Sequence, residues 1–198
     1  MKKCLLLITI VVLASVVPAR SRVDASAEEY AVYSAVIAEM FAGDRVTFDT
    51  QAKIKLLVIK DLTDTDVLTD YREQNEVYFG RMFPTLAAGV VKDYKARNKQ
   101  PVRLKDSFDL NIKHLVVKKE KIEKIFAGRG WWQEFYKIYP DSGGLIVLSR
   151  VGFSRAMNQA LVYIQHGCGG LCGTGHYVLL EKSGDRWQVV KRNMVWIS

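Results

Sequence analysis

The chain has little cysteine and little excess charge, and both shortages narrow its possible functions. Only three of the 198 residues are cysteines, but the chain is long enough to bury a hydrophobic core without disulfides. Lysine and arginine outnumber the acidic residues by 29 to 21. Part of that excess lies in the first two dozen residues and the rest is dispersed, which argues against a dedicated nucleic-acid binder. The content of 49% hydrophobic and 25% charged residues is typical of one globular domain.

Several catalytic signatures are also missing. The sequence contains no GxxxxGK[ST], which excludes a P-loop phosphate site, and no GxSxG or HExxH, which excludes two common hydrolase signatures. A catalytic site assembled from scattered residues stays open. The absence of an assembled motif favours a protein that is not an enzyme and that carries no cofactor.

The longest apolar run is too short to cross a membrane. Fourteen residues, Cys4 to Val17, reach about 21 Å as a helix, whereas the hydrocarbon core of a bilayer is about 30 Å thick. Two lysines precede the run and small residues follow it, a pattern typical of a secretory signal. Cleavage fits after Ala19 or after Ala25. We therefore predict a signal peptide over residues 1–25, a single domain over 26–198, and export to the periplasm or the medium without a stable membrane anchor. A retained membrane helix is the alternative.

The periodicity of apolar residues predicts an α+β fold. Ser26 and Glu29 form a capping box that begins a first helix, and Gly43 ends it. A short buried strand follows at 56–59, then helices beginning near 65 and 86, a strand at 110–117 and helices at 121–126 and 131–138. From Gly143 the period changes to two, with strands at 145–148, 160–166, 176–182 and 187–192. We expect N-terminal helices packed on one face of a C-terminal antiparallel meander, an arrangement similar to the NTF2-like cone.

One glycine-rich loop contains both cysteines of the mature chain. Cys168 and Cys172 are flanked by His166 and His176, and strand alternation places the two histidines on one face, near the thiols. In an exported protein a disulfide is the favoured interpretation. Fully extended, the two Cα atoms would be about 13 Å apart, so the loop must fold back to reach the limit of about 7 Å. The alternatives are zinc or copper held by His166, Cys168, Cys172 and His176, a redox or nucleophilic cysteine, and two unpaired thiols.

Other candidate sites have a structural explanation that we favour. Four aspartates near the end of the first strand suggest calcium: Asp61, Asp64, Asp66 and Asp70. The EF-hand order of ligands is missing, so helix capping at Asp64 or Thr65 and a solvated turn are favoured. The basic run from 118 to 124 is interrupted by glutamates and indicates a solvated helix face. Trp131, Trp132 and Phe135 could line a sugar or lipid groove, but their spacing favours core packing. We expect His114 to be structural or exposed.

The strands around the cysteine loop carry a set of motifs: Ser149-x-Val151-Gly152-Phe153, Ala160-Leu161-Val162-Tyr163, Cys168-Gly169-x-Leu171-Cys172-Gly173-x-Gly175, Tyr177-x-Leu179-Leu180-Glu181-Lys182, Trp187-x-Val189 and Trp196-x-Ser198. This set resembles the C-terminal signature of a family of exported bacterial proteins with no known activity. The start of the mature chain, Glu29-Tyr30 with Tyr33 and Ile37, is similar to the corresponding part of those proteins. The resemblance implies export from a bacterial cell and paired cysteines, and nothing catalytic.

Three functional hypotheses follow from the sequence. The first is an exported binding domain whose partner is a protein, a surface polymer or a small ligand. The second is a metal-binding or thiol-dependent protein that uses the loop between His166 and His176. The third is an enzyme with an NTF2-like pocket, for which the sequence offers no specific residue.

Overall fold

The computed structural model describes residues 24–42, 53–65 and 76–198. All but the last two residues of the predicted signal peptide therefore lie outside the described part. The elements, in chain order, are α1 (Ala27–Met40), β1 (Leu56–Lys60), α2 (Glu76–Met82), α3 (Val90–Arg97), β2 (His114–Val117), α4 (Lys119–Ala127), α5 (Trp131–Ile138), β3 (Ser142–Leu148), β4 (Gly152–Phe153), β5 (Gln159–Gly169), β6 (Cys172–Ser183) and β7 (Arg186–Ile197).

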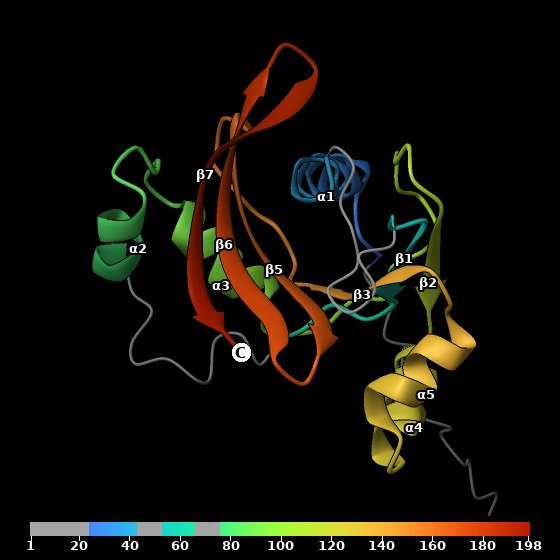
Figure 1. The fold of residues 1–198 in the computed structure, drawn as a ribbon. Helices are drawn as coiled ribbons and strands as arrows, with labels where there is room; N and C mark the ends of the chain where they lie inside the picture. Colours follow the sequence, from blue (N-terminus) through green and yellow to red (C-terminus); the bar gives the residue numbers. More distant parts are fainter. Residues whose placement is uncertain (1–23, 43–52, 66–75) are drawn as a thin grey trace, which may run out of the picture.

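The strands form one mixed sheet, and the predicted α+β class is confirmed (Figure 1). The strand order is β2-β1-β3-β5-β6-β7, and β4 pairs with β5 outside this path. From β3 onward the pairings are antiparallel, so β5, β6 and β7 form the expected meander. The sheet is larger than that meander, because β1 runs parallel to both β2 and β3 and extends it.

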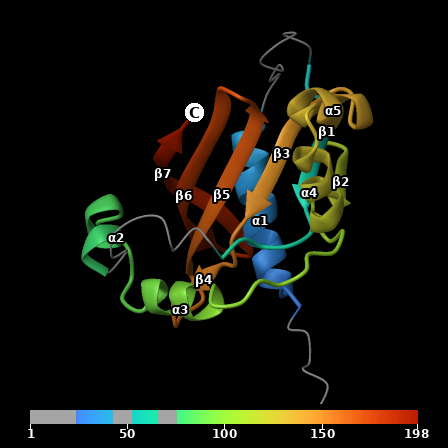
Figure 2. The ribbon, with the colours of Figure 1, turned by 90° about the horizontal axis from the view of Figure 1, so that it is seen from below.

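Helices cover both faces of the sheet, so the expectation of helices on a single face is wrong. The face that carries Val162 and Ile164 of β5 packs against α1. The opposite face, with Leu161 and Tyr163, packs against α2 and α3, and at the β1 end of the sheet the same face packs against α4 and α5 (Figure 2). The physical reason is that β5 lies in the middle of the sheet and is buried on both sides over its first six residues, as a central strand must be.

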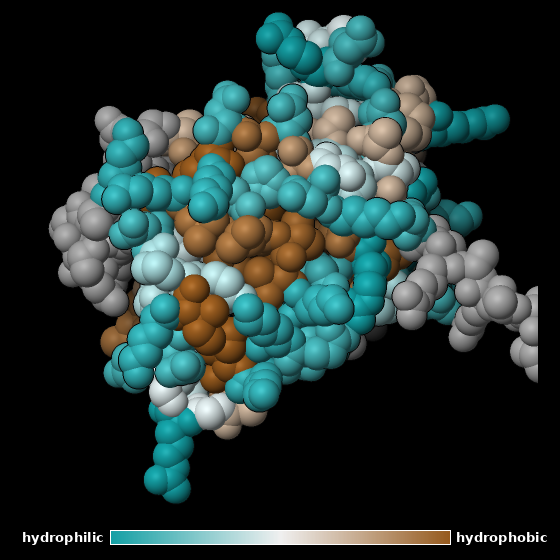
Figure 3. Space-filling model, turned by 90° about the vertical axis from the view of Figure 1, so that its right-hand side faces the viewer, coloured by the Kyte–Doolittle hydropathy of each residue, from teal (hydrophilic) through white to brown (hydrophobic). Residues whose placement is uncertain are grey.

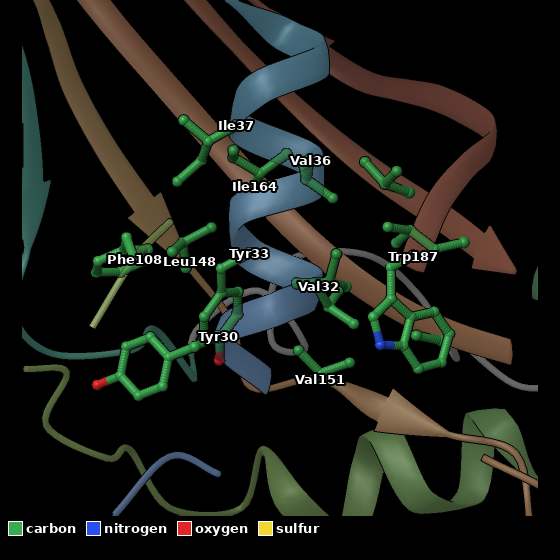
Figure 4. Packing of buried hydrophobic residues seen from close by; sticks show 14 of the residues in the cluster. Tyr30, Val32, Tyr33, Val36, Ile37, Phe108, Leu148, Val151, Ile164 and Trp187 are labelled. Atoms are coloured by element: carbon green, nitrogen blue, oxygen red, sulfur yellow. The ribbon is translucent and has the colours of Figure 1, made fainter. Parts of the chain in front are cut away.

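Helix α1 is buried over most of its circumference. The predicted capping box is present: Glu29 N donates to Ser26 Oγ at 3.2 Å, and Ser26 N donates to Glu29 Oε2 at 3.0 Å. The helix fills the curved face of the sheet between the segment around Phe108 and strand β7 at Trp187 (Figure 4). Tyr33 is fully buried there and donates from its hydroxyl to Ser149 O at 3.0 Å.

A buried ion pair joins the start of α1 to the segment between β3 and β4. The Glu29 carboxylate is fully buried and accepts two hydrogen bonds from Arg150, from Nε at 3.1 Å and from Nη2 at 3.0 Å. The buried Asn98 side chain, at the end of α3, accepts from Arg150 N at 2.8 Å and donates to Arg150 O at 3.0 Å. This bidentate pair with satisfied neighbours fixes α1, α3 and the 149–153 segment relative to one another.

The segment between β3 and β4 lies close against α3. A Cβ on Gly152 would lie 2.5 Å from Tyr94 Cα and 2.6 Å from Tyr94 N, so no side chain fits there. Phe153 N donates to Asp93 Oδ2 at 2.8 Å, which adds a polar tie to the same helix. The Ser149 to Phe153 motif and the Glu29-Tyr30 motif are thus explained by packing and by buried polar contacts.

The side of the molecule that carries β2 is shown in Figure 3. Apolar side chains gather at its centre and are surrounded by hydrophilic residues. Leu115 of β2 is 39% exposed, and Val116 and Ile112 are partly buried against the core under α1. The edge of the sheet on this side is the four-residue strand β2, which is short, as edges of soluble sheets commonly are.

Candidate functional site

The end of the β5–β6 hairpin is the candidate site. Gly167 pairs with Gly173 and Gly169 pairs with Cys172, so Cys168 is an extra residue on its strand, a bulge. Gly170 and Leu171 make the turn. The structure joins Cys168 and Cys172 as a disulfide with a Cα–Cα distance of 5.0 Å, within the range that a disulfide requires. The loop therefore folds back, as the disulfide interpretation requires.

Helix α5 supports one side of this hairpin end. The Tyr136 hydroxyl donates to Cys168 O at 2.9 Å. The Trp132 ring lies over Gly167, where a Cβ would meet the ring carbons at 3.2 Å. Gly144, on the neighbouring strand β3, has a φ of 101° and faces the backbone of Gly167, so a side chain is excluded there by both conformation and space.

The last residues of the chain support the other side. Ser198 N donates to Gly173 O at 3.0 Å, and Trp196 Nε1 donates to Tyr163 Oη at 2.6 Å. A Cβ on Gly175 would overlap both Trp196 and Tyr163. The glycines of the hairpin therefore make room for two tryptophans that hold it, a role that its sequence alone does not reveal.

The two histidines lie on one face, as strand alternation predicts. His166 Nε2 is hydrogen-bonded to Gly143 O, and its ring meets Phe41 edge-on at 5.1 Å. His176 pairs with Ile164 on the face that packs against α1, and it is 8% exposed. Its Nδ1 is buried without a hydrogen-bond partner. Burial lowers the pKa of His176, and the nearby positive charges of Arg192 and His166 lower it further.

This lowered pKa predicts a loss of stability in mild acid. In the unfolded chain histidine takes up a proton near pH 6.5, whereas folded His176 resists it. Below about pH 6.5 the unfolded state therefore binds more protons, and the free energy of unfolding falls as the pH decreases. We expect the drop between pH 8 and pH 5, measured by urea denaturation, to be smaller in His176→Phe than in the native chain. An identical drop in both proteins would contradict this role of His176.

The apex of the hairpin is apolar and uncharged. Leu171 is 85% exposed, the highest exposure of any large hydrophobic residue in the described part of the chain. No Asp, Glu, Lys or Arg occurs between His166 and His176. The disulfide, Trp132 and Trp196 hold the hairpin beneath this apex. The shape of the apex is therefore set before a partner binds. Such preorganisation lowers the ordering cost of binding.

The metal interpretation meets a chemical obstacle in this arrangement. The two sulfurs are bonded to each other, so they offer no thiolate to a metal unless the disulfide is reduced. Over residues 24–42, 53–65 and 76–198, no three His, Cys, Asp or Glu side chains converge as a metal site. The ligand set of His166, Cys168, Cys172 and His176 stays an alternative for the reduced chain only.

The aspartates after β1 that are described have structural partners. Asp61 pairs with Arg103 and accepts from Lys119 N at 2.7 Å, so it caps the start of α4 from a distant part of the chain. Asp64 lies 3.3 Å from Lys60 Nζ. Asp66 and Asp70 lie outside the described residues, as does most of the helix predicted from Thr65. Asp61 thus has a structural partner at the start of α4. The cap favoured at Asp64 or Thr65 belongs to a helix that lies mostly outside the described residues, so it stays a prediction.

His114 is also structural. Its Nδ1 lies 3.2 Å from Ile112 O, and its Nε2 lies 2.8 Å from Asp106 Oδ1. Both ring nitrogens therefore lie near oxygen atoms of the segment before β2, and these contacts account for His114 as a structural residue.

The two adjacent tryptophans have different environments. Trp132 and Phe135 pack in the core under α4 and α5, as expected. Trp131 is 60% exposed, so the expectation that it lies on the core face is wrong. Its backbone φ of 38° turns the residue away from the helical register that the spacing assumed. Trp132 takes the position against the core instead.

One open depression of about 480 Å³ lies along the start of α1. Two of its charged residues pair across it, with Lys105 Nζ 2.6 Å from Asp24 Oδ2. Two hydroxyls at its wall also have partners: Tyr30 Oη accepts from Lys105 N, and Ser34 Oγ accepts from Asp109 N. These contacts tie the start of α1 to the segment 105–109.

A scan of the chain against protein-family models, curated proteins and solved structures finds no match to any of them. The resemblance to exported bacterial proteins and to the NTF2-like cone therefore stays a prediction. Among the described residues, none of the helices is both long and apolar enough to cross a bilayer.

Proposed function

We propose that this chain is an exported binding domain whose contact surface is the disulfide-closed end of the β5–β6 hairpin. The observation that carries the proposal is Leu171, which is 85% exposed at the apex of a hairpin that is fixed on both sides. Because the hairpin is rigid, burying this side chain against a partner would cost little ordering entropy, which suits the apex to protein recognition. The partner we expect is a protein with an apolar pocket.

Two further observations support the proposal. A disulfide that closes a short loop is typical of a protein that works outside the cytosol, in line with the predicted signal peptide. The polar groups that drew attention in the sequence serve the fold: Glu29 pairs with Arg150, Asp61 caps α4, and His114 is held by Asp106. Leu171, in contrast, lies at the surface and contributes little to the core.

Site-specific cross-linking tests the proposal. A photoreactive phenylalanine analogue is placed at position 171 in the exported chain, and a matched one at Met157, which is 40% exposed in the loop between β4 and β5. We expect one discrete adduct at 171 and none at 157. Leu171→Asp should abolish capture of the same protein while leaving the folded state intact, because the side chain is on the surface.

Removal of the disulfide provides a second test of the same surface. A double variant, Cys168→Ala with Cys172→Ala, should reduce the yield of the adduct at 171, because the apex is then less ordered. Equal adducts at 171 and 157, or capture that survives Leu171→Asp, would contradict the proposed surface.

A further inference from the structure

The α4–α5 pair projects from the sheet and carries an excess of positive charge (Figure 1). Between residues 118 and 138 there are six cations and three carboxylates, which leave a net charge of +3. Each carboxylate is paired in the structure: Glu120 with Arg103, Glu123 with Lys119, and Glu134 with Lys137. Within the described residues, Lys118, Lys124 and Arg129 make no ion pair, so their charge faces solvent.

An exposed aromatic residue lies in the same segment. Trp131, two residues after Arg129, is 60% exposed, whereas the other three tryptophans of the chain are more buried. Ile138, two turns further along α5, is 39% exposed. The segment therefore combines free cations with apolar side chains, which a merely solvated helix face does not need.

The backbone at Trp131 is strained. Its φ of 38° lies in the left-handed region, which a bulky side chain rarely adopts. Such a conformation is unfavourable and is kept only where the surroundings impose it. Glycine would suit this position better, yet the chain carries a tryptophan that makes little use of the core. A surface role for the Trp131 side chain explains why tryptophan is kept at a strained position and why its ring is exposed.

We propose that the α4–α5 end docks on the surface of a lipid bilayer with anionic headgroups, with Lys124 and Arg129 facing the headgroups and Trp131 inserted at the interface. Tryptophan is enriched at the boundary between headgroups and hydrocarbon, because its ring is amphipathic. Basic residues beside it are attracted by the negative surface potential. A soluble polyanion would use the cations but would leave the exposed tryptophan and isoleucine without a partner. The inference is independent of the hairpin surface.

Vesicle binding by the processed chain tests the proposal. The probes are vesicles of phosphatidylglycerol with phosphatidylethanolamine, and neutral phosphatidylcholine vesicles for comparison. We expect binding to the anionic vesicles alone, weakened by salt, with a blue shift of tryptophan emission as Trp131 leaves water. Lys124→Ala and Arg129→Ala should each lower the affinity about five-fold. The matched control, Lys191→Ala on the exposed part of β7, should leave it unchanged.

Variants at Trp131 separate docking from folding. Trp131→Phe should keep the vesicle binding but lose the blue shift. Trp131→Gly should lower the affinity at least about ten-fold while keeping or raising the thermal midpoint, because glycine relieves the strained φ. Equal binding to neutral vesicles, or binding unaffected by Trp131→Gly, would overturn the proposal. So would tight binding to heparin with no vesicle binding, which would indicate a soluble polyanion as the partner.

Discussion

Glu29→Gln is expected to lower the free energy of unfolding by about 3 to 5 kcal/mol, the cost of leaving one member of a buried ion pair alone. The change removes the negative charge from a fully buried position while Arg150, 8% exposed, keeps its positive charge. Arg97 Nη1, at 3.9 Å from Glu29 Oε2, adds a second cation to the same place. The measurement is urea denaturation followed by circular dichroism at pH 7.

The matched control is Glu39→Gln, at the other end of α1. Glu39 pairs with Arg192 at 3.2 Å, but both side chains are about a third or more exposed, so we expect a loss below about 1 kcal/mol. A double variant, Glu29→Leu with Arg150→Met, should lose much less stability than Glu29→Leu or Arg150→Met alone, because apolar residues of similar size can replace a buried pair. If Glu29→Gln costs no more than Glu39→Gln, the pair does not hold the fold.

Gly152→Ala is expected to be the second severe change. Its Cβ would lie 2.5 Å from Tyr94 Cα, and because this contact is with backbone, no side-chain rotation relieves it. Helix α3 would have to move away from β4, and we expect a loss of about 3 kcal/mol, at the upper end of the usual range for overpacking. Thermal unfolding measures the loss.

Gly80→Ala is the control for that change. Gly80 lies within α2, and a Cβ there meets nothing within 4 Å. Alanine should therefore raise the stability by about 0.5–1 kcal/mol through its better helix propensity. Similar midpoints for the Gly152 and Gly80 variants would show that α3 and β4 are not in close contact.

The sequence was sufficient to predict those elements whose signals are local. The capping box of α1 depends on two residues three apart, and the strands of the meander depend on an alternation that any half-buried sheet imposes. The turn that joins β6 to β7 is local in the same way, because Gly184 takes a positive φ of 60°, which glycine adopts readily. The α+β class could be predicted for this reason.

The remaining features depend on contacts between distant residues. Whether β1 joins the C-terminal strands is decided by its pairing with β3, which no local pattern encodes. Apolar residues at both odd and even positions of β5 are the signal that helices cover both faces. That signal is present in the sequence, but the alternation around it is also typical of a half-buried strand. Glu29 and Arg150 are 121 residues apart, so their pairing could not be predicted.

The sequence predicts the disulfide of the candidate site but does not reveal the residues that support the hairpin. The cysteines and histidines are recognisable by residue type and spacing, and export makes a disulfide the favoured state. Tyr136 and Trp132, which hold the hairpin from α5, lie more than 30 residues before the residues that they contact, so no local pattern links them to the loop. The exposure of Leu171 and Trp131 likewise results from the whole fold, since hydrophobicity alone places such side chains inside.

The state of the two hairpin cysteines tests the central claim most directly. The processed chain is taken from the producing cells, denatured with an alkylating agent and no reductant, and weighed intact by mass spectrometry, while a second sample is analysed for zinc and copper. We predict that Cys168 and Cys172 carry no alkyl group and that the protein contains no stoichiometric metal. Two alkylated cysteines together with one zinc or copper per chain would contradict the closed hairpin and favour the ligand set with His166 and His176.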